Sequence, residues 1–174
     1  QGVRKLGYTP FQIPLAVNSR AYGGRATCTN SGMCVMFGCP VHAKASPLSV
    51  GVPRAQATGR LDLRPQSLVY ELVVDEAGRI KAARYLDAKG QQNEVRARQF
   101  VLAGGSLGSA HLLLMSRSGR FANGLANGSD LVGRNLMQHV LPAVYYRHEA
   151  VTRGWLGPLA GQAIDDLHDS DAAR

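Results

Sequence analysis

Gln99-Phe-Val-Leu-Ala-Gly-Gly-Ser-Leu-Gly-Ser-Ala-His-Leu-Leu-Leu-Met-Ser116 is the stretch that decides the fold. Its apolar run Phe100 to Ala103 predicts a buried strand that ends at Gly104-Gly105. Ser106 is expected to cap a helix, because apolar residues recur after it at helical spacing. Doubly wound proteins use a strand that passes through glycines into a helix to bring main chain close to a nucleotide. The spacing is not Gly-x-Gly-x-x-Gly, so an ordinary strand–turn–helix explains the stretch equally well.

The segment before this stretch predicts a small antiparallel sheet. Leu68 to Val74, Ile80 to Leu86 and Asn93 to Arg98 each have the length and alternation of a strand. The turn-forming sequences Asp75-Glu-Ala-Gly78 and Asp87-Ala-Lys-Gly90 separate them. We therefore expect a three-stranded meander over residues 68–98.

The remaining chain shows weaker patterns. Ser46-Pro47 predicts the cap and first position of a helix that runs to about Thr58, with Pro53 kinking or breaking it. Residues 1–27 are rich in turn formers and predict an extended segment. Residues 131–139 predict a short turn or helix, and Val140 to Tyr146 a strand.

Composition limits the class of protein. Over 174 residues, 45% are hydrophobic and 18% charged, which is typical of a folded globular chain. The net charge is +8, but the 20 Lys and Arg residues are spread singly, so we expect a basic surface and no nucleic-acid partner. Apolar runs are shorter than the ~20 residues that a membrane span needs. The first residues carry no signal for localisation, and the chain reads as if it began partway through a longer protein.

Several motifs occur in one order along the chain. They fall in four groups: Gly24-Arg-Ala-Thr-Cys28 with Gly32-Met-Cys34, Gly38-Cys-Pro40 and Ala43-Lys-Ala-Ser46; Val69 with Asp75-Glu-Ala-Gly-Arg79 and Arg84-Tyr-Leu-Asp87; Val101-Leu-Ala-Gly-Gly-Ser106 with Gly108-Ser109; and Leu125-Ala-Asn127 with Leu131-Val-Gly-Arg-Asn-Leu-Met137 and His139. Together the groups resemble the glucose–methanol–choline (GMC) family of flavin oxidoreductases, closest to its bacterial gluconate- and sorbitol-dehydrogenase branch. Two positions depart from the family pattern: Ala110 stands where a proline is usual, and Ser116-Arg117 where serine–glycine is usual.

The resemblance implies an α/β fold: part of a FAD-binding doubly wound domain with an antiparallel β-meander. It also implies that residues 1–174 form a single partial domain, the middle of such an enzyme. The family's Gly-x-Gly-x-x-Gly loop and catalytic histidine would then lie before and after it. The parent protein would oxidise an alcohol or sugar CH–OH group by hydride transfer to FAD, and this chain alone would be inactive. Its electron acceptor is not indicated.

The resemblance implies that four residues of this chain contact the FAD cofactor. Val69 resembles the strand residue whose main chain contacts the adenine. Ala103, Gly104 and Gly105 resemble the strand end that passes the ribose and pyrophosphate. No residue of this chain is assigned a catalytic role: His139 matches a structural position, His42 is expected to be solvated or packed, and His111 to face outward from its helix.

The cysteines leave alternatives open. Cys28, Cys34 and Cys39 are odd in number and local, unlike a secreted disulfide framework. Some relatives hold an iron–sulfur cluster with three cysteines in a comparable loop, but the spacing here is looser, and no metal site is assigned. We therefore expect the three cysteines to be buried free thiols, or one disulfide and one free thiol, rather than cluster ligands. Two further functions remain open: a non-catalytic binding or assembly module derived from the family, and a small iron–sulfur electron carrier.

Overall fold

The three strands of the meander form one antiparallel sheet. In the computed structural model, which describes residues 2–145, 147–158 and 161–166, they are β2 (Leu68–Val74), β3 (Ile80–Leu86) and β4 (Gln92–Arg96). All neighbours are antiparallel, in the order β2-β3-β4. The predicted meander is confirmed, although β4 begins one residue earlier than expected and ends two residues earlier.

Both hairpin turns form where turn chemistry predicts them. The N–H of Gly78 donates to the carbonyl of Asp75 at 2.9 Å, and Gly90 does the same with Asp87 at 2.9 Å. Gly78 has a φ of +81°, a left-handed conformation that a side chain would strain. The aspartates also use their carboxylates, because Arg79 N–H donates to Asp75 Oδ1 at 2.8 Å.

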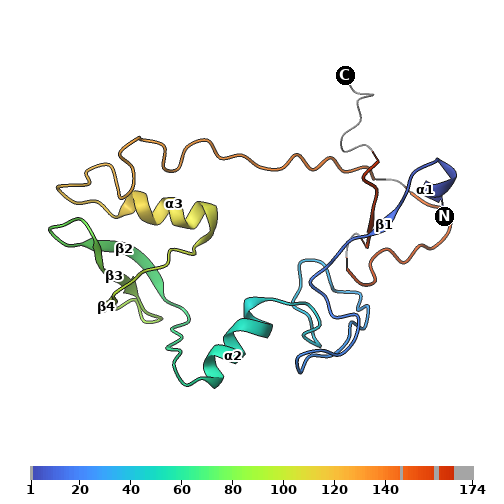
Figure 1. Cartoon of the computed structure of the whole chain (residues 1–174), viewed down its shortest axis with the longest axis horizontal. Coiled ribbons are helices and arrows are strands. Elements are labelled where there is room, and N and C mark those ends of the chain that lie inside the picture. Colours follow the sequence, from blue (N-terminus) through green and yellow to red (C-terminus); the bar gives the residue numbers. More distant parts are fainter. Residues whose placement is uncertain (1, 146, 159–160, 167–174) are drawn as a thin grey trace. The chain divides into compact units, whose positions relative to one another are not determined.

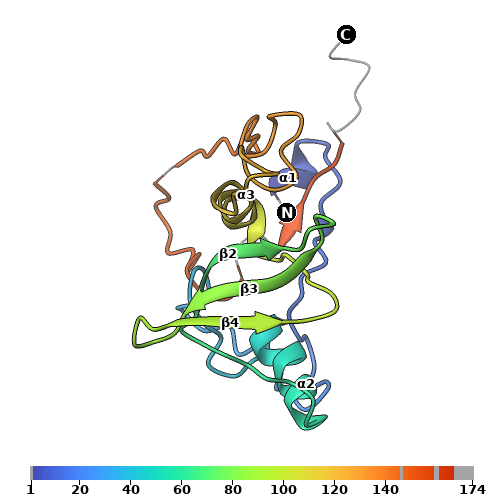
Figure 2. The ribbon, with the colours of Figure 1, turned by 90° about the vertical axis from the view of Figure 1, so that its left-hand side faces the viewer.

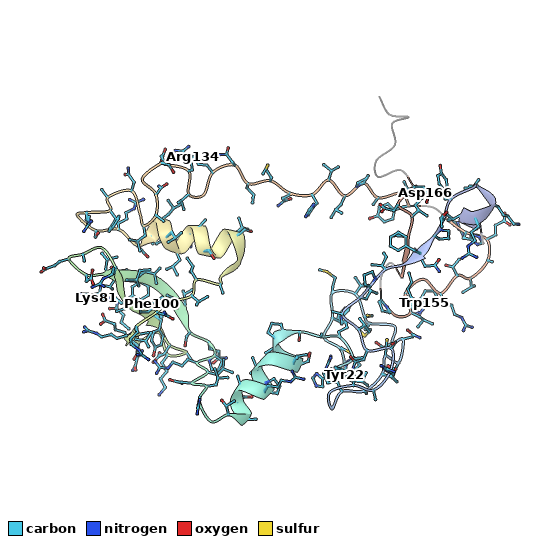
Figure 3. All side chains as sticks on the ribbon, in the orientation of Figure 1. Tyr22, Lys81, Phe100, Arg134, Trp155 and Asp166 are labelled. Atoms are coloured by element: carbon cyan, nitrogen blue, oxygen red, sulfur yellow. The ribbon has the colours of Figure 1, made fainter. Side chains whose placement is uncertain are left out.

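Helix α3 (Gly105–Met115) follows the meander and packs against β2, and Figure 2 shows it beside that edge of the sheet. The core between them holds Leu72, Ala83 and Leu125, with partly buried apolar side chains around it: Val74, Ile80, Phe100, Leu112, Leu113 and Phe121. Phe100, labelled in Figure 3, is one of these partly buried side chains. The helix predicted over Leu107 to Met115 is confirmed.

The predicted strand at Phe100 to Ala103 is wrong. The segment has no strand pairing, and Val101 is 90% exposed. A strand needs a neighbour to receive its hydrogen bonds, and no described residue pairs with this segment. The predicted Ser106 cap is also wrong, because the helix begins at Gly105 with Gly104 in the cap position, where no side chain can accept a hydrogen bond.

The chain's contacts divide it into two compact units. The meander unit is residues 62–144, and the cysteine-loop unit is residues 1–61 with 145–174. The single partial domain expected from the sequence therefore stays a prediction. Figure 1 shows the elements of both units along the chain.

The cysteine-loop unit has short regular elements. They are α1 (Gly2–Lys5), β1 (Phe11–Gln12), a π-helical turn η1 (Pro47–Gly51), α2 (Val52–Ala57) and β5 (Gln162–Ala163). β1 and β5 pair antiparallel. The extended segment predicted for residues 1–27 is wrong over residues 2–5, which form α1, and from residue 6 the segment is largely irregular apart from β1.

The Ser46-Pro47 start is confirmed. Ser46 caps the turn: its hydroxyl accepts the Ser49 N–H at 3.2 Å. The predicted end at about Thr58 is also close: α2 ends at Ala57, and Thr58 is its C-cap before Gly59. Pro53 lies where the backbone changes from π- to α-helical, since it has no N–H to continue the earlier pattern.

Two predictions fall in the segment after α3. Residues 131–139 contain a turn, in which Arg134 N–H donates to Leu131 O at 3.1 Å, and are otherwise irregular. The strand predicted from Val140 is wrong over residues 140–145, where apolar side chains are exposed and no pairing occurs. Its last residue, Tyr146, lies outside the described residues.

Candidate functional site

An apolar hollow in the meander unit brings together most of the predicted cofactor contacts. It has a volume of about 570 Å³, within the range of small-molecule sites. One wall is the meander, including Val69 and Leu72, and another is α3, including Gly108 and Leu112. The segment Phe100–Gly104 forms a third side. Three separate parts of the sequence therefore contribute to one site.

Val69, Ala103 and Gly104 all line this hollow, as the sequence resemblance anticipates. Val69 lies in β2 next to a register shift between Val69 and Glu71, where the ladder with β3 is irregular. Gly105 is not part of the lining. The role of all four residues in cofactor binding stays a prediction.

The two glycines act in different ways. A Cβ on Gly104 would lie 3.4 Å from Gly108 C and Ser109 N, so main chain rather than a side chain packs against the first turn of α3. Gly105 has open space around a Cβ but a φ of +72°, which L residues rarely adopt. A Cβ at Gly104 would be in ordinary contact with α3, whereas the backbone conformation of Gly105 disfavours any side chain.

Because Gly108 has no side chain, the wall of the hollow formed by α3 leaves free space at this position. A Cβ added there would meet nothing within 4 Å, although the residue lines the hollow. His111, one turn further along α3, is exposed as expected and also lines the hollow. Sequence reasoning missed both residues as parts of the site, although the i, i+4 spacing of Gly104 and Gly108 could have indicated a shared helix face.

The three cysteines lie in the cysteine-loop unit as free, half-buried thiols. Cys28 Sγ interacts with Asn30, whose N–H donates to it at 3.4 Å, and Cys39 Sγ accepts the Ala43 N–H at 3.2 Å. Among the described residues, no three His, Cys, Asp or Glu side chains gather to hold a metal ion. The three thiols do not meet at one point in this structure.

Lys44 holds the cysteine loop in shape. Its ammonium group donates to Cys34 O at 2.5 Å and to Phe37 O at 2.7 Å.

The Cys39 thiol accepts hydrogen bonds from backbone N–H groups, and that of Lys44 has the largest effect. These bonds hold the pKa of the thiol below its usual range. The loop thus stabilises a thiolate at Cys39. The neighbouring His42 is exposed, with a φ of +53°.

A second hollow, of about 610 Å³, lies in the cysteine-loop unit near Asn18, Thr27 and Asn30. Its polar side chains already serve the chain itself. The Asn18 amide donates to three carbonyls, and Thr27 Oγ1 donates to Ser19 O at 3.0 Å. This hollow is therefore the weaker candidate for a ligand site.

Comparison with known proteins identifies the family. Residues 1–141 match the family model described as GMC oxidoreductase. Similar curated proteins include 6'''-hydroxyparomomycin C oxidase of Streptomyces lividus, 41% identical over 75% of this chain and 24% of that protein. The fructose dehydrogenase large subunit of Gluconobacter japonicus is 33% identical over 97% of the chain and 30% of that protein. The gluconate 2-dehydrogenase flavoprotein of Pantoea cypripedii is 27% identical over 97% and 29%.

The chain belongs to the GMC oxidoreductase family, whose cofactor is FAD. The match bears out the expected fold class, part of a FAD-binding α/β domain with an antiparallel meander. The chain spans less than a third of the length of these relatives. In the part of the chain that the structure describes, no helix is long and apolar enough to cross a membrane.

Proposed function

We propose that this chain is the middle portion of a FAD-dependent dehydrogenase or oxidase that acts on an alcohol or sugar hydroxyl. The observation that carries the proposal is the apolar hollow, in which Val69, Ala103 and Gly104 meet from separate segments. Related proteins named for fructose, gluconate and paromomycin-type substrates favour a sugar or a sugar-like polyol. When bound, FAD accepts the hydride of the CH–OH group.

The residues of this chain would hold the adenine half of the cofactor. The apolar walls from Leu72, Ala83 and Leu112 suit a flat aromatic ring, because they exclude water from its faces. The absence of side chains at Gly104 and Gly108 lets the ring or ribose approach main chain. Gly105, with its left-handed backbone, turns the chain from the Phe100–Ala103 segment into α3.

No catalytic group is proposed within this chain. His139 is exposed, and His111 lines the hollow proposed for the adenine rather than for the substrate. The proton of the alcohol would therefore be accepted by a residue outside this sequence. General-base catalysis is typically worth about 10²- to 10⁴-fold in rate, so the isolated chain should not turn over substrate.

The test is to purify the complete gene product that carries this chain and the 174-residue chain separately. The complete product should retain FAD and oxidise sugars or alcohols with a dye acceptor. The isolated chain should bind FAD weakly or not at all in a fluorescence titration. A complete product without flavin would contradict the proposal and favour a non-catalytic module. Sub-micromolar FAD binding by the isolated chain would show that the cradle for the pyrophosphate lies within these residues.

Gly108→Leu locates the site within the complete product. The substitution favours the helix over glycine and places a side chain in open space against the hollow, so the fold should be retained while FAD affinity falls by about tenfold or more. Gly119→Leu is the matched control, because Gly119 also has open space but does not line the hollow. Equal FAD affinity in both variants would remove the hollow from the cofactor site.

A further inference from the structure

Ser116, the residue that ends α3, is almost completely buried, with 1% of its surface exposed. Its hydroxyl donates to Leu112 O at 2.7 Å and accepts the N–H of Leu72 at 2.8 Å. A serine hydroxyl has one hydrogen to donate and accepts through its lone pairs. The group is therefore used in both directions, once toward the helix and once toward the sheet.

The two residues that Ser116 joins lie on different walls of the hollow. Leu72 lines it from β2, and Leu112 lines it from α3. β2 is an edge strand of the meander, with β3 on one side only. Ser116 supplies the partner that the edge strand lacks at Leu72, and so it fastens the helix to that edge.

Such a connection opposes closure of the hollow. Apolar walls that enclose open space gain by moving together, because collapse removes surface from water and restores contacts. A hydrogen bond of fixed length between sheet and helix limits that movement. Val69 lies three residues from Leu72 on the same strand, and Gly108 lies one turn from Leu112 on the same helix.

We propose that Ser116 is a positioning residue for the cofactor: its hydroxyl sets the spacing between β2 and α3 at which the adenine half of FAD fits. The inference rests on the function proposed above and extends it to a residue that does not itself line the hollow. A capping serine that served the helix alone would need only the bond to Leu112. The second bond, to a strand 44 residues earlier, is what connects the residue to the site.

The experiment compares Ser116→Ala with Leu125→Ala in the complete gene product. Leu125 belongs to the same buried cluster but does not line the hollow, so its truncation lowers stability without removing the hydrogen bond that joins β2 to α3. FAD and ADP are titrated at a temperature at which both variants are folded, and ADP isolates the adenine half. Ser116→Ala removes both hydrogen bonds of the hydroxyl, and losing the one that joins sheet to helix should weaken both ligands by about fivefold or more. Leu125→Ala should lower the Tm with FAD and ADP affinities within about twofold of wild type.

Ser116→Cys provides a second variant if the alanine variant does not fold. A thiol is a weak donor and acceptor of similar size, so its FAD affinity should lie between those of wild type and alanine. Equal FAD affinity in Ser116→Ala and Leu125→Ala, in a wild type that binds FAD, would overturn this inference and leave the proposed function standing. A wild-type product that binds neither FAD nor ADP would overturn both.

Discussion

The meander unit and the cysteine-loop unit satisfy their main-chain polar groups in different ways. In the meander unit, the ladders β2-β3 and β3-β4 and the helix α3 pair the backbone with itself. The cysteine-loop unit has short regular elements, and side chains of Asn18, Arg25 and Lys44 donate to its backbone carbonyls. Regular elements bury an apolar core, whereas Ala43 is the fully buried apolar residue described in the second unit. We therefore expect changes in core packing to lower the stability of the meander unit most. In the cysteine-loop unit, the loss of polar side chains should have the larger effect.

The largest effect should come from Gly124→Ala in the meander unit. Gly124 is buried with a φ of +96°, and an added Cβ would lie 2.8 Å from Leu113 O and from Leu114 Cα. We expect a loss of about 3 kcal/mol in the free energy of unfolding, because overpacking and left-handed strain add. Chemical denaturation measures it. Gly119→Ala, with open space and no positive φ, should change stability by less than about 0.5 kcal/mol.

A smaller, local effect should follow Asn18→Ala in the cysteine-loop unit. The Asn18 amide donates to Tyr22 O, Arg25 O and Ala26 O, and its oxygen accepts from Arg25. We expect a local loss of about 1–2 kcal/mol and faster hydrogen exchange over residues 17–30.

Asn93→Ala is the matched variant in the meander unit. Its amide donates to Asp87 Oδ2 and Gln91 O, but the β3-β4 ladder holds the same segment. Exchange over residues 80–96 should change little. Equal acceleration in both variants would show that the two units do not differ in how they depend on side-chain hydrogen bonds.

Acid should weaken the turns of the meander unit. Backbone N–H groups, from Arg79 at Asp75 and from Gln91 at Asp87, hold the pKa of each carboxyl below its ordinary value. A lowered folded pKa contributes stability above the unfolded pKa of about 3.9, and this stability is lost as the pH falls through the folded pKa. Thermal melts should therefore be level from about pH 8 to pH 5 and fall below about pH 4.

Asp75→Asn and Asp87→Asn should reduce this acid dependence, because the amides keep an acceptor oxygen but do not titrate. An equal fall in Tm from about pH 5 to about pH 3 in the wild type and in the double variant would contradict the assignment to the turns.

The smallest effect concerns reactivity in the cysteine loop. The lowered pKa of Cys39 predicts that iodoacetamide reacts with this half-buried thiol at a lower pH than with glutathione. Peptide mass mapping assigns the modified residue, and Cys39→Ser should remove the early phase. Reaction at the same pH as glutathione would show that the loop does not stabilise the thiolate.

Local sequence was enough to determine the meander. Leu68–Val74 and Ile80–Leu86 have the bounds that alternation and turn residues predict, because strand faces and hairpin turns depend on neighbours a few residues away. The helix start at Ser46-Pro47 and its end before Gly59 are equally local. The resemblance to the GMC family, carried by motifs in order, also needed no structure.

Tertiary structure decided the rest. Phe100–Ala103 and residues 140–145 have the composition of strands, but a strand forms only where another chain segment accepts its hydrogen bonds, and sequence pattern does not report that partner. Likewise, the sequence presents Ser116 as a polar residue after a helix. Only the fold brings it to Leu72, 44 residues earlier, where one buried hydroxyl joins the two walls of the candidate site.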